Sequence, residues 1–439
     1  MASNIKPSRE IPSTTLESFK FWWGSNDKAG AMSEDRLFSR LPFYTPSWDK
    51  NSTPSGDITA SVSKVELSTP KRFLNTLSIL PTLSDKDNSA SAHTQAPVPS
   101  ATVVLPGYGA GIGFFYLNFP SLASWVRRRR TPVYAVDWLG MGRSARVPFS
   151  VKAKREDNVG RATEAEAFFI DALEEWRIKQ GLEQMALIGH SLGAYLSAAY
   201  ALRYPDRVSR LILLSPCGIP QNKDAMDADS ESNDSDSVNA PSIRSSSVDS
   251  ATRQEIKNQR AAFKARRKDF AQNPNKVLRF FFWAWETGLS PFQFVRSTLF
   301  WGPMLVGRYS SRRFPHLPEE DVRDLHEYLW HITSAKGSGE YSISHILTPS
   351  IGAYARYPLV ERIDKLKVPV TFVYGDHDWM DPEGGRESVK RLKAASNPDA
   401  NIYVVKDAGH HVYLDNPSVV DELILRELDR VPQRPSTPV

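Results

Sequence analysis

The sequence is short of cysteine, of long apolar runs and of charge of one sign. Its 439 residues include a single cysteine, Cys217, which excludes a disulfide within the chain. No stretch approaches the roughly 20 uninterrupted apolar residues of a membrane-spanning helix, so we expect any membrane contact to be peripheral. The net charge is only +5, and this mild excess does not indicate a nucleic-acid partner.

The N-terminal residues do not resemble a targeting segment. MASNIKPSREIPSTT has no apolar run after its basic residues, as a secretory signal requires. Acidic residues at Glu10, Glu17 and Asp27 are atypical of a mitochondrial presequence, which is rich in Arg and poor in acids. Cys217 ends the apolar stretch LILLSPCG, which favours a buried, unreactive thiol. Together these features predict an intracellular protein.

Short apolar runs alternate with helical patterns over much of the chain. The runs ATVVLPG, TPVYAVD, MALIGHS, LILLSP, VPVTFVYG and IYVVKDAG have the length and composition of buried strands. Strands that alternate with helices form a parallel sheet covered on both faces. The sequence therefore predicts an α/β fold with a doubly wound, mostly parallel sheet.

Composition divides the chain into five segments. Residues 1–99 form a poorly patterned leader, and the α/β pattern occupies residues 100–220 and again 358–439. Residues 221–252 are rich in Asp and Ser and poor in apolar residues, so we expect them to be disordered. Residues 253–357 have mainly helical patterns. A helical insertion between strands of such a sheet is expected to form a cap over the carboxyl ends of the strands, where ligands bind.

The pentapeptide GHSLG, residues 189–193, lies between a predicted strand and a predicted helix. Gly-x-Ser-x-Gly in this context is the sequence form of a nucleophile elbow, in which the serine occupies a strained turn. The flanking glycines are needed there because a Cβ atom at either position would clash. Ser191 is therefore the candidate nucleophile.

A serine hydroxyl needs a base at neutral pH, and the base needs an acid that orients it. In sequences with this elbow the chain order is Ser, acid, His. The stretch VYGDHDWMD follows one later strand and offers Asp378, with Asp381 as the rival acid. The stretch DAGHHVYLDNP follows the next strand, and we take His410 rather than His411 as the base because it directly follows the glycine.

A carbonyl under attack becomes negatively charged, so backbone amides must stabilise it. The expected donors are Leu192, which follows the nucleophile, and Tyr108 in the loop LPGYGAG. The glycines of that loop also resemble a phosphate-binding loop, but no G-K-[ST] follows and no acidic ribose partner stands at the expected place. An oxyanion hole made by Tyr108 and Leu192 is the better interpretation.

The helical insertion contains a stretch rich in aromatic residues, LRFFFWAWETGLSPFQFVRSTLFWGPMLVGRY, with Arg279, Arg296 and Arg308 interleaved. These aromatics either pack the cap onto the core or contact acyl chains, and the arginines suit phosphate headgroups. Two basic runs, residues 127–130 and 264–270, either attract an anionic membrane or form solvated helix faces.

The motifs LPGYGAGIGFFYLNFPSLA, VDWLGMGRSAR, GHSLGAYLSAAYALRYPDRV, VYGDHDWMD and DAGHHVYLDNP, in this order, resemble a lipid-acting subfamily of the α/β-hydrolases. That subfamily contains the fungal cardiolipin-specific deacylase, the N-acyl-phosphatidylethanolamine lipase and the lipid-droplet lipase coactivator. The resemblance implies the α/β-hydrolase fold, with a cap inserted before the strands of the acid and the histidine. In several animal members the acid corresponds to Asp381, which keeps that residue as the alternative to Asp378.

The resemblance implies a serine-dependent hydrolase of glycerophospholipid acyl esters, cardiolipin among them, that remodels lipids at a membrane surface. Phospholipid is then the substrate, and neither a metal nor an organic cofactor is needed. The coactivator has Asn at the nucleophile position, so Ser191 favours an active enzyme. A mitochondrial location suits cardiolipin, while the cytoplasm and the lipid droplet are the alternatives.

Some members are reported as acyl-CoA-dependent lysophosphatidic acid acyltransferases through an H-x-x-x-x-D motif, which here runs from His410 to Asp415. The motif also has a plainer interpretation, because His410 is already the expected triad base and Asp415-Asn416-Pro417 has the pattern of a helix start. The acyltransferase, with acyl-CoA as a partner, is therefore an alternative function. A non-catalytic lipase-binding module is a second alternative.

Overall fold

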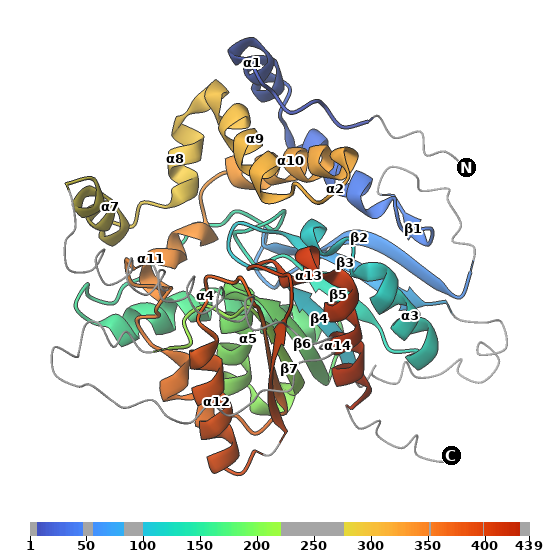
Figure 1. The fold of residues 1–439 in the computed structure, drawn as a ribbon, viewed down its shortest axis with the longest axis vertical. Coiled ribbons are helices and arrows are strands. Elements are labelled where there is room, and N and C mark those ends of the chain that lie inside the picture. Colours follow the sequence, from blue (N-terminus) through green and yellow to red (C-terminus); the bar gives the residue numbers. More distant parts are fainter. Residues whose placement is uncertain are drawn as a thin grey trace, which may run out of the picture.

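A computed structural model describes residues 7–46, 56–82, 100–220, 276–350, 353–397 and 399–430. The expected disordered segment 221–252 and the basic run 264–270 lie outside these residues. The described chain forms a nine-stranded sheet with the order β1-β2-β3-β5-β4-β6-β7-β8-β9 (Figure 1). The strands are β1 (Tyr44–Thr45), β2 (Ile58–Glu66), β3 (Phe73–Pro81), β4 (Ser100–Leu105), β5 (Val133–Val136), β6 (Gln184–His190), β7 (Val208–Leu214), β8 (Val370–Gly375) and β9 (Ala400–Val405).

The six strands from β5 to β9 in this order are parallel, as the sequence predicts. Their apolar runs are buried on both faces, because successive side chains point to opposite sides of the sheet. In β7, Leu211 and Leu213 belong to one hydrophobic core, and Ile212 and Leu214 belong to the other. The predicted doubly wound α/β architecture is confirmed.

Helices cover both faces of this sheet. One core includes side chains from α4 (Asn158–Lys179), α5 (Leu192–Arg203) and α12 (Pro382–Ala394), and the other includes side chains from α3 (Phe119–Arg129) and α14 (Pro417–Asp429). The remaining short helices of the core are α13 (Val412–Asp415) and the 3-10 turns η1 (Ile112–Phe115), η2 (Pro205–Arg207), η6 (Leu359–Glu361) and η7 (Ile363–Lys365). Cys217 is buried, as expected, and burial raises the pKa of its thiol to about 12.

The leader contributes three strands that the sequence did not predict, the two-residue β1 and the longer β2 and β3. β2 and β3 form an antiparallel pair in which Ile58 faces Pro81, and β3 pairs antiparallel with β5. Ser, Thr, Asn and Lys interrupt the apolar residues of ITASVSKVE and FLNTLSILP, and the outer strand β2 is largely exposed over its second half. β1 pairs with β2 only at Ala60 and Ser61, so the rest of β2 has no neighbouring strand on that side. Such an edge needs no continuous apolar run, which explains why the pattern of β2 is weak.

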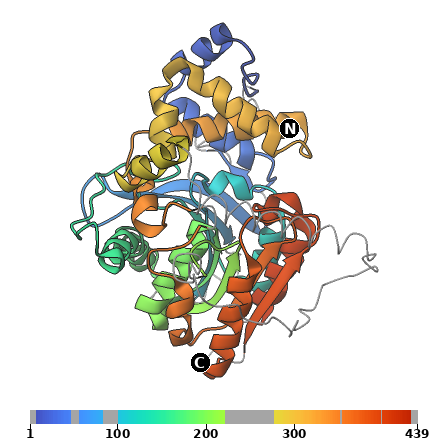
Figure 2. The ribbon, with the colours of Figure 1, turned by 60° about the vertical axis from the view of Figure 1, so that its left-hand side comes forward.

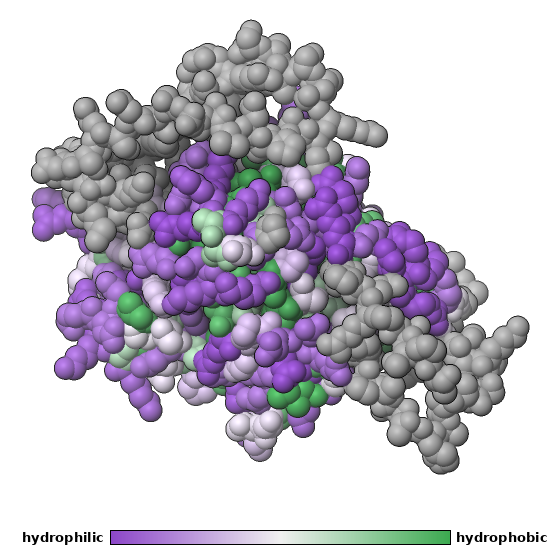
Figure 3. All heavy atoms as spheres, turned by 90° about the horizontal axis from the view of Figure 1, so that it is seen from below, coloured by the Kyte–Doolittle hydropathy of each residue, from purple (hydrophilic) through white to green (hydrophobic). Residues whose placement is uncertain are grey.

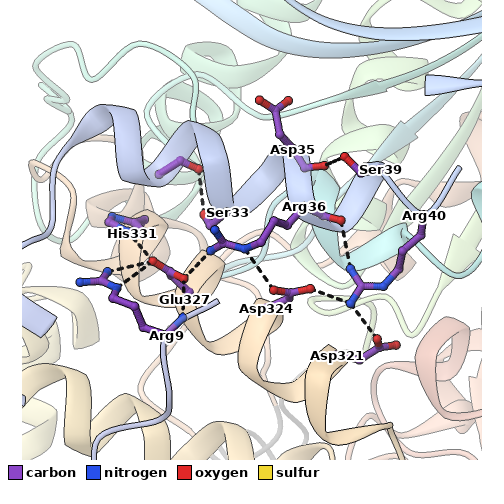
Figure 4. Close-up of polar contacts among 11 residues, drawn as sticks. Arg9, Ser33, Asp35, Arg36, Ser39, Arg40, Asp321, Asp324, Glu327 and His331 are labelled. Atoms are coloured by element: carbon purple, nitrogen blue, oxygen red, sulfur yellow. Dashed lines mark hydrogen bonds and ion pairs between the residues drawn. The ribbon is translucent and has the colours of Figure 1, made fainter. Parts of the chain in front are cut away.

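Two helices of the leader, α1 (Thr15–Trp23) and α2 (Asp27–Phe38), precede these strands. α2 packs along α10 (Glu319–Ser334), and a row of ion pairs joins them (Figure 4). Arg36 pairs with Asp324 at 3.1 Å and also with Glu327, while Arg40 reaches Asp324 at 2.6 Å. Arg9 donates to Glu327 at 2.9 Å from the segment before α1. Each of these largely buried carboxylates has a cationic partner, as charges withdrawn from water require.

The chain between β7 and β8 contains the helices α7 (Lys276–Glu286), α8 (Pro291–Ser297), α9 (Gly302–Arg313), α10 and α11 (Ile343–Ile346), with the turns η4 (Leu299–Trp301) and η5 (Gly339–Ser342); we call them the cap helices. Helices α8, α9 and α10 lie together with α1 and α2 at one end of the molecule, α7 lies at its side, and α11 lies beside α4 (Figures 1 and 2). The Phe292 ring stacks on Tyr108 in the loop after β4, at 4.9 Å between centroids. Arg313 pairs with Asp415, which lies beyond β9. The cap helices therefore contact loops that follow the carboxyl ends of the parallel strands.

None of the helices in the described part of the chain combines the length and the hydrophobicity needed to cross a bilayer.

Candidate active site

Ser191 lies in a sharp turn between β6, which ends at His190, and α5, which begins at Leu192. Its φ of 52° and ψ of −115° are a strained conformation for a residue with a Cβ atom. A Cβ on Gly189 would lie 2.6 Å from the Ala194 Cα, and one on Gly193 would lie 2.4 Å from the Pro106 carbonyl oxygen. Both glycines of the pentapeptide are therefore required by close backbone approach, and the turn has the form of a nucleophile elbow.

His410 connects Ser191 to Asp378. Its Nε2 atom lies 3.0 Å from the Ser191 Oγ, and its Nδ1 atom lies 3.0 Å from the Asp378 Oδ1. The carboxylate only accepts hydrogen bonds, so Nδ1 carries the proton, and Nε2 is left to accept the hydrogen of the serine hydroxyl. The Asp378 side chain is fully buried, which strengthens its interaction with the imidazole. The three residues have the contacts that proton transfer from the serine requires.

The rival residues lie elsewhere. Asp381 is the N-cap of α12, where its Oδ1 accepts the Glu383 amide at 3.0 Å. The His411 ring packs against Phe114 with 6.0 Å between centroids, and its Nδ1 atom lies 3.1 Å from the Arg313 Nη2, whereas the hydrogen bond to Ser191 is made by His410. Both acids follow one strand and both histidines follow another, so the sequence left Asp381 as a rival, while the position after Gly409 favoured His410 over His411.

The expected oxyanion donors lie beside the serine. Leu192 is the first residue of α5, and amides in the first turn have no acceptor within their own helix. Gly107 passes so close to the nucleophile that a Cβ there would lie 3.0 Å from the Ser191 Cβ and 2.8 Å from the His190 Nδ1. Tyr108 follows this glycine directly, so its amide is at the edge of the same space.

Comparison with known proteins agrees with this geometry. Residues 102–417 match the family described as the alpha/beta hydrolase fold. The chain belongs to the α/β-hydrolase family.

Relatives of this hydrolase act on lipids according to their names. A probable 1-acylglycerol-3-phosphate O-acyltransferase of Oryza sativa subsp. japonica is 34% identical over 79% of this chain and 68% of that protein. The (lyso)-N-acylphosphatidylethanolamine lipase of Homo sapiens is 32% identical over 75% of this chain and 79% of that protein. The 1-acylglycerol-3-phosphate O-acyltransferase ABHD5 of Homo sapiens is 32% identical over 75% of this chain and 77% of that protein. These relatives confirm the resemblance to the lipid-acting subfamily.

A further residue of the site, His190, is the second residue of the pentapeptide and was not predicted from the sequence. Its Nε2 donates to the main-chain carbonyl of His410 at 3.0 Å, because that carbonyl only accepts. Burial, followed by the nearby His410, lowers the pKa of His190 well below its usual value, so the ring is neutral. His190 therefore holds the backbone of the candidate base. Its position directly before Ser191 was the feature of the sequence that could have indicated a role in the site.

Two further residues near His410, Trp379 and Arg313, were not predicted, and only Trp379, which follows Asp378, stands next to a predicted site residue in the sequence. The Trp379 ring lies 5.0 Å from the imidazole and is partly exposed. Arg313 of α9 reaches the loop that carries His410 and binds Asp415, the last residue of the H-x-x-x-x-D motif. The expected helix start after Asp415 is present, with Asn416 as the N-cap of α14 and Pro417 as its first residue, although no side chain caps it.

Proposed function

We propose that this α/β-hydrolase cleaves acyl esters of glycerophospholipids at a membrane surface, with Ser191, His410 and Asp378 as its catalytic triad. The observation that carries the proposal is the linkage of the three side chains by two contacts of 3.0 Å each, with the serine in a strained elbow. The names of the related lipase and acyltransferases support a lipid ester as the substrate class.

The reaction begins when the Ser191 Oγ attacks the ester carbonyl and its proton passes to the Nε2 of His410. Asp378 accepts the Nδ1 hydrogen throughout and stabilises the imidazolium that forms. The amides of Leu192 and Tyr108 would donate to the carbonyl oxygen as it becomes negative. His410 then gives its proton to the departing lysolipid oxygen, and water releases the fatty acid from Ser191. The chemistry uses neither a metal nor an organic cofactor.

Exposed apolar side chains on the cap helices and on α1 support contact with a membrane. Trp23 is 74% exposed, Phe294 is 70% exposed and Phe280 is 64% exposed. α1 packs against the cap helices here, since the centroids of the Phe19 and Phe300 rings are 6.0 Å apart. The other exposed members of this surface are Leu16, Phe281, Trp283, Leu289, Leu299, Trp301, Leu305 and Tyr309.

We call these residues the apolar surface. By contrast, the visible face of the opposite end is mostly hydrophilic, with apolar residues scattered over it (Figure 3). A gathering of large apolar side chains on one end of a protein indicates an interaction site, and aromatic residues suit the boundary of a bilayer.

The basic residues near the apolar surface differ in their availability. Arg279 and Arg308 are exposed and could meet phosphate headgroups. Arg296, which the sequence grouped with them, instead donates to Glu340 at 2.6 Å within the protein. The basic run on α3 is also engaged, since Arg127 pairs with Asp57. An anionic membrane would therefore be attracted mainly by the exposed arginines of the cap helices.

The alternative function is transfer of an acyl group from acyl-CoA to lysophosphatidic acid. The names of the Oryza and human acyltransferases favour it. The same acyl-enzyme on Ser191 would then be attacked by the lysolipid hydroxyl rather than by water, with His410 again accepting the proton.

A lipid survey separates these functions. The wild-type protein and the variant Ser191→Ala are incubated with mixed phospholipids, including cardiolipin and phosphatidylethanolamine, with and without acyl-CoA, and the products are measured by mass spectrometry. We expect one diacyl class to be converted to its lyso form by the wild type alone. Gain of acyl chains only with acyl-CoA would assign the transferase. Equal results for both proteins, with the fold verified by circular dichroism, would reject catalysis by Ser191 and favour a lipase-binding module.

A second comparison tests the membrane surface. Phe294→Asp should lower hydrolysis of phospholipid vesicles far more than hydrolysis of a water-soluble ester, because the charge opposes insertion into the bilayer. Ile178→Asp is the matched control, since Ile178 is an exposed apolar residue on α4, outside the apolar surface. An unchanged ratio of the two rates in Phe294→Asp would remove the membrane contact from the proposal.

A further inference from the structure

We propose that Asp415 and Arg313 are positioning residues that hold the loop of His410 against cap helix α9, so that the H-x-x-x-x-D motif is a structural tether. This inference rests on the proposed role of His410 as the base. It gives the motif a function different from acyl transfer and connects the cap helices to the catalytic histidine.

Asp415 closes the loop that carries His410. Its Oδ2 atom accepts the Gly409 amide at 2.9 Å, and its own amide donates to the His411 carbonyl at 2.9 Å. Gly409 and His411 are the two chain neighbours of His410. Asp415 therefore contacts the backbone on both sides of the base, through its carboxylate at Gly409 and through its own amide at His411, and only the first of these contacts needs an acidic side chain.

Arg313 attaches this loop to the cap. It is the last residue of α9, and its Nη1 and Nη2 atoms each lie 3.0 Å from one oxygen of Asp415. Two parallel contacts of this kind define direction as well as distance. The Nη2 atom also lies 3.1 Å from the His411 Nδ1. Burial first, and then the neighbouring His190, His410 and Arg313, lower the pKa of His411 well below its usual value, so its neutral Nδ1 accepts from the guanidinium.

The geometry leaves Asp415 no direct role at the imidazole of His410. Both nitrogens of that ring are engaged, Nδ1 by Asp378 and Nε2 by Ser191. Both oxygens of Asp415 are engaged as well, by Arg313 and by the Gly409 amide. The carboxylate thus acts on the base only through the backbone.

Space next to the tether allows the loop to move when the tether is broken. A cavity of about 540 Å³ borders it, lined in part by Arg312, Arg313, His316, Gly409 and Asp415. Without the ion pair, the Gly409 side of the loop has room to shift toward this cavity. A shift of a fraction of an ångström in the imidazole is enough to slow proton transfer, because reactivity depends steeply on the position of the reacting groups.

The test uses Asp415→Asn, Arg313→Met and the double variant. Hydrolysis of p-nitrophenyl butyrate measures kcat and KM, and the rate of Ser191 labelling by a fluorophosphonate measures activation of the serine without any lipid. We expect kcat and the labelling rate to fall by about 10- to 100-fold in each single variant, with KM little changed. The kcat and labelling rate of the double variant should be no lower than those of the less active single variant, because the two residues act as one unit.

Arg313→Lys is the milder variant, which keeps the charge but loses the two-point contact, and it should give intermediate rates. Asp429→Asn is the matched control, because Asp429 also pairs with arginines, Arg128 and Arg129, at the surface end of α14. Its kcat should equal that of the wild type. Melting temperatures verify that each variant is folded.

Two results would overturn the inference. One is a wild-type kcat and labelling rate in Asp415→Asn and Arg313→Met. The other is selective loss of acyl transfer to lysophosphatidic acid in Asp415→Asn with hydrolysis unchanged, which would make Asp415 a transfer group. Fluorophosphonate labelling needs no phospholipid, so it tests the tether separately even if the wild type proves inactive on membrane lipids and the proposed function fails.

Discussion

Gly107 offers a sharp test of how closely the oxyanion loop approaches the nucleophile. Its backbone does not have a positive φ, so alanine meets no conformational barrier there. The added Cβ would instead lie 2.8 Å from the His190 Nδ1, 3.0 Å from the Ser191 Cβ and 3.2 Å from the His190 carbonyl oxygen. The carbonyl oxygen belongs to the backbone and the Ser191 Cβ is bonded to it. None of the three atoms is the far end of a flexible side chain that could move aside.

The expected magnitude follows from these distances. Ordinary contacts begin near 3.4 Å, so Gly107→Ala must push the loop and the elbow apart by several tenths of an ångström. Overpacking of this kind costs about 1–3 kcal/mol of stability. The displacement separates the Tyr108 amide from the oxygen it should stabilise, and loss of one such donor lowers kcat by about 100- to 1000-fold. We therefore expect a folded protein with at least a tenfold lower kcat.

Steady-state hydrolysis of a water-soluble ester and a urea unfolding curve measure the two effects. Gly30→Ala is the control, because Gly30 is also buried within the protein but its new Cβ would lie at an ordinary 3.4 Å from the His331 Cβ. A Gly107→Ala variant with the activity of the wild type and of Gly30→Ala would refute the placement of the oxyanion hole at this loop.

Three further predictions concern acidic residues. Asp378→Asn should lower kcat by about 10⁴-fold because the histidine loses its orienting acceptor, whereas Asp381→Asn retains a capping side chain and should leave kcat unchanged in the same ester assay. Burial raises the pKa of Asp421 from 3.8 to about 6, so the folded state binds a proton more tightly than the unfolded state. Stability should therefore decrease by about 3 kcal/mol as pH rises from 3 to 7, and this contribution should be absent from urea unfolding of Asp421→Asn. Glu427→Gln should lose about 3 kcal/mol in urea unfolding, since it leaves the buried Arg210 with one partner fewer.

The sequence predicted site residues well where a motif stands next to its strand in the chain. The elbow at Ser191 needs only the residues from Gly189 to Gly193 and the strand before them. Asp378 and His410 each lie in the loop that follows a strand, so the order of the chain was enough to propose them. The parallel sheet followed from continuous apolar runs, which is a property of strands buried on both faces.

Strands with mixed polar and apolar residues, and contacts between residues far apart in the chain, could not be predicted in the same way. β2 was missed because its polar residues suit a partly exposed second half, and β3 was missed because it buries Asn75 and Thr76, whose hydrogen-bond partners Asp137 and Trp176 are distant in the sequence. The choice between Asp378 and Asp381 depended on which carboxylate reaches His410 across 32 positions of sequence, and only folding brings that pair together. Arg313 joins Asp415 from 102 positions away, and nothing near either residue in the sequence indicates the contact.

The sequence by itself determined the order of the six parallel strands along the chain, the elbow, and the residue types available for a triad, because each depends on neighbours within a few positions. Tertiary structure decided the partners: which acid meets His410, that His190 and Asp415 hold its backbone, and that α1 joins the cap helices in one apolar surface. These outcomes depend on packing between elements far apart in the chain, and the local pattern of residues does not encode such distances.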